Sequence, residues 1–109
     1  MGCASLPIGA FSFRNIYSTA DATTPEQFLF GIPGKTAVIT DIVISTDTAL
    51  KAWVEDDDNA VLIVDLYLPA TSVWSKTWSS PIELTEGYSA YIASSVAGNI
   101  SITVTGYYK

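Results

Sequence analysis

The chain has 109 residues, 49% of them apolar, with 11 acidic and 5 basic side chains and no histidine, which gives a formal net charge of −6. A chain of this size fits a single domain with a core that needs no disulfide, metal or cofactor. The acidic excess repels phosphate backbones and anionic lipid, and the basic residues are scattered. Nucleic acid and membrane surfaces are therefore not expected as partners.

Residues 1–25 differ from the rest and are expected to form an extended N-terminal arm, followed by one β-rich domain over residues 26–109. Within the arm, Phe11, Phe13 and Tyr17 share one alternating phase, which predicts a short strand over 11–17 with three rings on one surface. Three exposed rings would be costly in water. The arm is therefore expected to pack either on its own domain or on a neighbouring subunit.

A period of two dominates the remaining residues. Ile100, Ile102 and Val104 alternate with hydroxyl side chains, which predicts a half-buried strand over 100–105. The same alternation, or a concentration of β-branched residues, predicts further strands over 27–32, 35–45, 50–54, 60–68, 72–78 and 88–94.

Short turn sequences separate these strands. Pro33 and Gly34 fit the two central positions of a type II turn, and other corners are expected at 69–72, 85–87 and 96–99. About eight strands with turns every 8–12 residues or so predict an all-β, antiparallel sandwich or barrel.

No catalytic residue is predicted. The chain lacks histidine, the commonest proton shuttle at neutral pH, and its lone thiol at Cys3 has no histidine to activate it. Asp41, Asp65, Glu83 and Glu86 are the carboxylates from which a glycoside-hydrolysing pair could be drawn, but each is more simply explained as a solvated strand or turn residue. We expect a protein that is not an enzyme.

No metal site is predicted either. Residues 55–59 place five oxygen-bearing side chains together, as calcium prefers. The spacing departs from the EF-hand, because Ala60 and Val61 stand where further ligands and a glycine are needed. The acidic segment is interpreted as a charged hairpin tip, with a calcium site as the alternative.

Trp74 and Trp78 are four residues apart and so lie on one face of a strand, with Lys76 between them. Such a face is not expected to line the sandwich interior. Tryptophan and tyrosine are enriched where subunits meet, which favours an interface over intramolecular packing or a glycan platform. The candidate interface residues are Phe11, Phe13, Tyr17, Trp74 and Trp78. Because an indole ring stacks on sugars, Trp53, Trp74 and Trp78 are the candidate glycan-binding residues.

The segment 30–45, FGIPGKTAVITDIVIS, resembles the opening of small jelly-roll domains in virion proteins of tailed bacteriophages, where a similar run supplies a first turn and a long strand. Segments 66–72, 80–88 and 100–108 are similar to the later corner, connection and closing strand of that family. The resemblance covers about residues 28–108 and implies that the sandwich is jelly-roll-like.

Domains of this family occur as capsid cement or decoration proteins, as fibre modules and as glycan-binding tips. The resemblance implies a cement or decoration protein on the capsid surface, a homotrimer that stabilises the shell by contacts with the major capsid protein and with itself. A receptor- or glycan-binding module of a tail or head fibre is the alternative. The chain departs from the pattern at Tyr88, where Asp is common, and in its longer acidic loop at 56–58, so ligand binding is not carried over.

Overall fold

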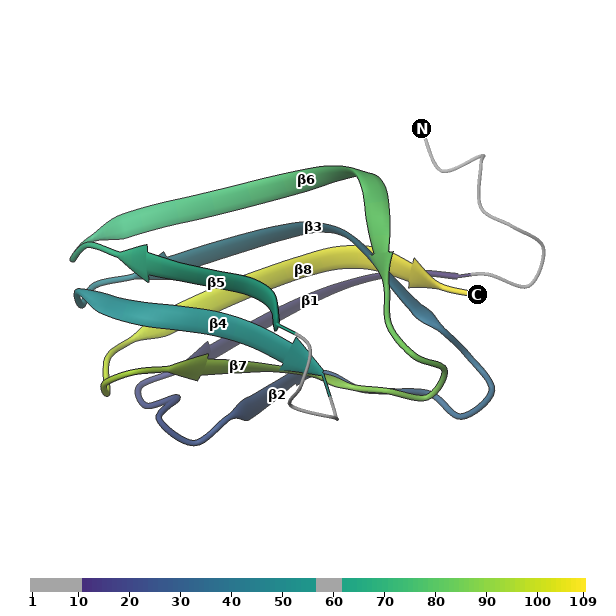
Figure 1. The fold of residues 1–109 in the computed structure, drawn as a ribbon, viewed down its shortest axis with the longest axis horizontal. Coiled ribbons are helices and arrows are strands. Elements are labelled where there is room, and N and C mark those ends of the chain that lie inside the picture. Colours follow the sequence, from purple (N-terminus) through teal and green to yellow (C-terminus); the bar gives the residue numbers. More distant parts are fainter. Residues whose placement is uncertain (1–10, 57–61) are drawn as a thin grey trace.

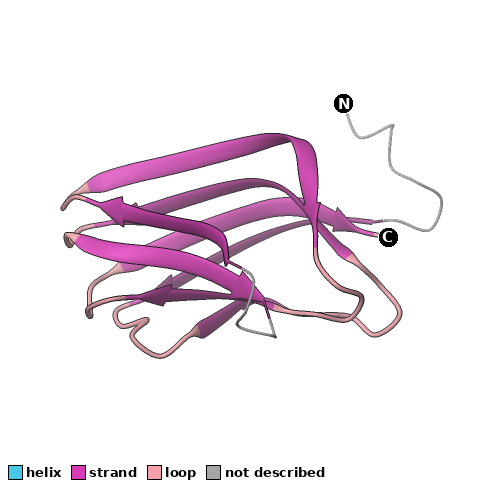
Figure 2. Cartoon of the chain, viewed as in Figure 1, coloured by secondary structure: helices cyan, strands magenta, loops and turns pink. Residues whose placement is uncertain are grey.

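The computed structural model describes residues 11–56 and 62–109, and these residues form eight strands and no helix (Figures 1 and 2). The strands are β1 (Phe11–Thr19), β2 (Glu26–Leu29), β3 (Ala37–Thr46), β4 (Leu50–Asp56), β5 (Leu62–Leu68), β6 (Ser72–Glu83), β7 (Ala90–Ser94) and β8 (Ile100–Tyr108). Each predicted strand overlaps one of them. The all-β prediction is therefore confirmed.

The strands form two four-stranded antiparallel sheets that pack face to face (Figure 1). Sheet A has the order β1-β8-β3-β6 and sheet B the order β2-β7-β4-β5. The chain therefore crosses repeatedly between the sheets instead of completing one first. Eight strands in two interleaved sheets make a jelly-roll sandwich, as expected.

Alternation along the strands determines which side chains form the core. On β8, Ile100, Ile102 and Val104 are buried, while the hydroxyl residues between them are partly exposed. Ile44 of β3 pairs with Ile102, and both are almost completely buried. Leu68 of β5 is also buried. The half-buried strand predicted over 100–105 is confirmed, with the predicted residues facing inward.

A bulge at Thr40 explains the nearly continuous apolar run of β3. The pairing with β8 shifts between Ile39 and Asp41, so Thr40 is the extra residue. Ile39 before the bulge and Ile42 after it are both fully buried, although an unbroken strand would put them on opposite faces. The bulge therefore keeps the apolar residues of both halves of β3 in the core.

Residues 11–19 of the predicted arm are a complete strand of sheet A. β1 pairs with β8 along nine residues, from Phe11 opposite Tyr108 to Thr19 opposite Ile100. The Phe11 and Phe13 rings lie 5.2 and 4.9 Å, between centroids, from the Tyr108 ring. Phe13 and Tyr17 pack against the core. These rings thus lie on their own sandwich, and the arm's residues 1–10 lie outside the described part of the chain.

Candidate interaction surfaces

Three rows of side chains cross the outer side of sheet A, a surface that we call outer face A. The strand registers align each row across β1, β8, β3 and β6. The rows are Ser18, Ser101, Ser45 and Val73; Ile16, Thr103, Val43 and Ser75; and Arg14, Thr105, Asp41 and Thr77. Small hydroxyl and β-branched side chains dominate, because the outward phase of each strand carries them.

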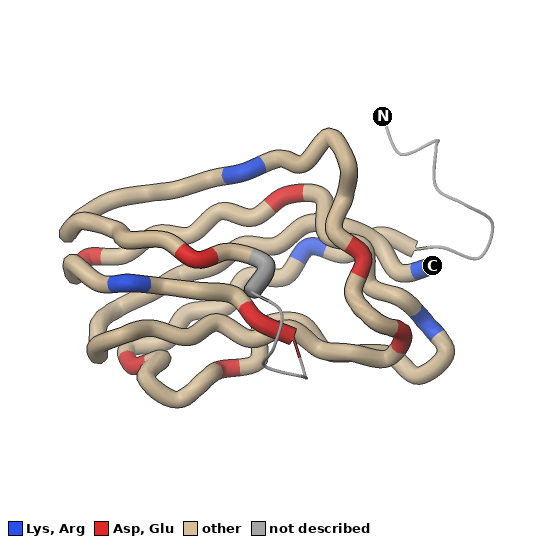
Figure 3. Tube along the Cα trace, viewed as in Figure 1, with Lys and Arg blue, Asp and Glu red and all other residues tan. Residues whose placement is uncertain are grey.

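Outer face A exposes apolar groups without net charge. Val73 is 70% exposed, Ile16 66% and Val43 39%. Its two charged residues, Arg14 and Asp41, have opposite sign, whereas the whole chain carries −6. Figure 3 shows both the basic and the acidic residues distributed over several strands and loops. Outer face A is therefore a neutral surface on an acidic protein.

Of the two charged side chains in the third row of outer face A, only Asp41 has a polar partner among the described residues. The Asp41 carboxylate accepts a hydrogen bond of 2.5 Å from the Thr77 hydroxyl on β6, which fixes its orientation. Arg14 lies two strands away from Asp41, roughly 10 Å at the usual strand spacing. Among the described residues, Arg14 makes no ion pair. Its guanidinium is left available to a partner.

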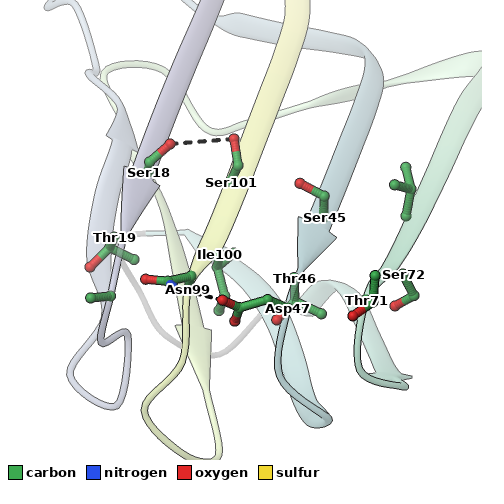
Figure 4. Close-up of a pocket in the computed structure, with 12 residues that line it drawn as sticks. Ser18, Thr19, Ser45, Thr46, Asp47, Thr71, Ser72, Asn99, Ile100 and Ser101 are labelled. Carbon is green, nitrogen blue, oxygen red and sulfur yellow. Dashed lines mark hydrogen bonds between the residues drawn. The ribbon is translucent and has the colours of Figure 1, made fainter.

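A hollow of about 650 Å³ borders outer face A, where β1 and β3 end and β6 and β8 begin (Figure 4). Hydroxyl side chains line much of it, and Ser18 and Ser101 approach within 3.4 Å of each other. Asn99 donates a hydrogen bond of 2.7 Å to the Asp47 carboxylate. This bond, with a second from the Thr48 hydroxyl, lowers the pKa of Asp47 below its usual value. Because Asp47 is the one titratable side chain among these lining residues, the hollow offers polar contacts but no acid–base pair.

Trp53 lies on the opposite side of the molecule, on the outer side of sheet B, which we call outer face B. Its register partners are Asp65 of β5 and Ala93 of β7. Next to it, Tyr67 is 80% exposed. The Lys51 ammonium lies 5.6 Å from the centroid of the Tyr67 ring and 3.5 Å from the Asp65 carboxylate. Outer face B thus combines two aromatic rings with an exposed ion pair.

Trp74 and Trp78 lie on the inner side of sheet A, contrary to the expectation that their face avoids the interior. Both are partly buried and pack against the core from β6. Lys76 between them is exposed, because β6 is an edge strand and a lysine there reaches solvent past the rim of the sandwich. A charge in the inward phase of an edge strand also discourages pairing with strands of other chains.

The predicted candidate residues do not form one site. Phe11, Phe13 and Tyr17 belong to β1 and the pair Trp74 and Trp78 to β6, at opposite edges of sheet A, while Trp53 is on sheet B. Their role in an interface or in glycan binding stays a prediction. Sequence reasoning missed outer face A, although the alternating hydroxyls at 101–105 mark one of its two inner strands.

The carboxylates considered for catalysis are dispersed. Asp41 is on outer face A and Asp65 on outer face B, with the sandwich between them. Glu83 forms an ion pair of 2.9 Å with Lys109. Within residues 11–56 and 62–109, no group of three metal-ligating side chains occurs. Of the acidic segment, residues 57–59 lie outside the described residues. None of the described segments is a helix of the length and apolar character that a membrane crossing requires.

A search of protein-family models finds none that matches the chain, and no curated protein is significantly similar to it.

Proposed function

We propose that this protein is a structural protein of a tailed-phage virion, a capsid cement or decoration protein that stabilises the shell by protein–protein contacts. The proposal rests on the resemblance of four segments to small jelly-roll virion domains. The observation that supports it best is outer face A, a neutral, partly apolar sheet face on a chain of charge −6. Such a face approaches another protein without the repulsion that the rest of the surface would cause.

The adhesive contribution of one copy is small. Fully burying an aliphatic side chain contributes about 1.5–3 kcal/mol, and Ile16, Val43 and Val73 are each already partly covered. A single contact is therefore worth a few kcal/mol before the cost of association. An array of copies on a shell adds many such contacts, and multivalency makes detachment rare.

Binding to empty shells of the phage that encodes the protein tests this function. We expect the protein to cosediment with the shells at saturating stoichiometry and to raise their melting temperature. Val73→Asp should abolish both effects, because it puts a charge into an apolar part of outer face A. Tyr67→Asp on outer face B is the matched control and should bind normally. Shells that neither bind the protein nor change in stability would refute the proposal.

A glycan-binding fibre module is the second candidate, favoured by outer face B. Trp53 and the highly exposed Tyr67 provide flat rings, and Lys51 and Asp65 provide polar groups beside them, a combination suited to sugars. On this alternative, host polysaccharide binds the protein, Trp53→Ala weakens binding and Val73→Asp leaves it intact. Failure of the wild-type protein to bind polysaccharide would eliminate this candidate.

A further inference from the structure

The charged residues of outer face A are placed symmetrically about β8, one of the two inner strands of sheet A. Arg14 on β1 and Asp41 on β3 both pair with Thr105 of β8, one from each side. Each therefore lies one strand spacing from β8, in the same row. Ile16 and Val43 have the same relationship to Thr103 in the next row. Two copies of this face can therefore be placed against each other so that opposite charges meet and apolar side chains meet.

We propose that outer face A pairs with the same face of a second copy of this chain, about a two-fold axis that runs parallel to β8. This inference rests on the proposed function for its choice of surface and deepens it, because the second copy covers β1, β8 and β3 while Val73 on β6 stays outside the pair and available to the shell. A two-fold axis makes an isologous contact, in which each residue meets its counterpart reciprocally.

The axis direction follows from the positions of the charges. Rotation about an axis along β8 exchanges the β1 and β3 sides and keeps every row in place. Arg14 then faces Asp41 of the partner subunit, and Asp41 faces Arg14 of the partner subunit. Rotation about an axis across the strands would leave each strand facing its own counterpart, so these opposite charges would not meet. Only the axis along β8 brings both charged residues of each copy opposite a residue of opposite charge.

The same rotation matches the apolar side chains. Ile16 faces Val43 of the partner subunit, and the reverse contact follows by symmetry, while Thr103 lies on the axis and faces its own copy. Packed sheets lie about 10 Å apart, which an arginine can span and which small hydroxyl residues leave room for. The axis along β8, which the charges select, thus also brings apolar side chains together.

The size of the face sets the strength of the pair. Three strands and three rows that overlap with the partner cover roughly 14 Å by 20 Å, or about 300 Å² of flat area. Stable complexes bury about 800 Å² per partner, so the pair is expected to be weak in solution. We expect a dissociation constant in roughly the micromolar to millimolar range in solution. On a surface that concentrates the copies, a larger fraction of them is expected to be paired.

Sedimentation velocity of the full chain, over about 1 µM to about 1 mM, tests the pairing without any shells. We expect the wild type to form a concentration-dependent dimer. Arg14→Asp and Asp41→Arg should each raise the dissociation constant by about tenfold or more, and the double charge swap should restore it to within about threefold. Lys51→Asp on outer face B is the control and should dimerise like the wild type.

A second variant keeps the test decisive if Asp41→Arg fails to fold. Thr103→Lys puts a lysine on the axis, where it must face its own copy, and should abolish the dimer while circular dichroism still reports a folded protein. A protein that stays monomeric throughout, or a dimer or trimer that Thr103→Lys does not disturb, would overturn the pairing. A dimer that ignores shells would support the pairing and refute the proposed function alone.

Discussion

The Tyr17 hydroxyl on β1 donates a hydrogen bond of 2.5 Å to the Glu26 carboxylate on β2 and so joins the edge strand of sheet A to the edge strand of sheet B. Tyr17→Phe removes this bond but keeps the ring that packs on the core. We expect the free energy of unfolding to fall by about 1 kcal/mol, as measured by chemical denaturation. Tyr67→Phe, on an exposed ring, is the control and should change it little.

The same bond predicts a loss of stability at high pH. The hydrogen bond to Glu26 comes first among the causes that raise the pKa of Tyr17 above its usual value of 10, followed by burial. A raised pKa favours the protonated hydroxyl in the folded state. Its contribution is complete below pH 10 and disappears as the pH rises through the higher pKa of the folded state. The wild type and Tyr17→Phe should converge in stability there, and a difference that persists would contradict this origin.

Asn99→Ala should raise the pKa of Asp47 towards its ordinary value of 3.8, because the Asn99 amide is the main group that lowers it. A lowered pKa contributes stability that is present above pH 3.8 and lost as the pH falls through the folded-state pKa. Carboxyl chemical shifts in an NMR titration measure the change. Asp21, which the Thr23 hydroxyl and amide hold at a lowered pKa, is an internal reference and should not move.

The two sides of sheet A should differ sharply in their response to truncation. Ile44→Ala empties space in the core and should cost about 2–5 kcal/mol, because Ile44 is completely buried opposite Ile102. Ile16→Ala, on outer face A, should change stability by less than about 0.5 kcal/mol. Thermal unfolding at low protein concentration compares them. Equal effects would mean that the inner and outer phases are wrongly assigned.

Gly106 cannot accept a side chain where β8 passes β3. A Cβ at this position would overlap the Val38 carbonyl oxygen and stand 2.9 Å from the Phe13 ring. Gly106→Ala should therefore cost about 3 kcal/mol or more. Gly34→Ala, in open space but at a φ of 79°, should cost only about 1 kcal/mol. Urea denaturation of both variants tests the difference, and similar losses would contradict the close approach.

Local patterns were sufficient to locate the strands and one turn. The alternation of Ile100, Ile102 and Val104 marks a strand without knowledge of its neighbours. The turn at Pro33 and Gly34 also follows from local chemistry: Gly34 has a φ of 79°, and the Lys35 amide donates to the Ile32 carbonyl at 3.0 Å. Such features depend only on adjacent residues, so the sequence suffices for them.

Features that depend on distant residues were predicted less well. The spacing of Trp74 and Trp78 correctly puts them on one face, but whether that face points inward depends on the position of β6 in its sheet. Lys76 between them suggested an outer face, because a lysine is not expected in a sandwich interior. On an edge strand, however, a lysine in the inward phase can reach solvent past the rim. Outer face A was missed for the same reason, since its rows exist only once four strands are paired in register.

The insertion of β8 between β1 and β3 has a consequence for biosynthesis. Both neighbours of β8 precede it in the chain, so sheet A lacks one of its two inner strands until translation has passed residue 108. β1 and β3 cannot complete their ladders before β8 has been made, so the folding of sheet A is a largely non-local and comparatively slow event. Until then the apolar sides of β1 and β3 are available to chaperones and to other nascent chains.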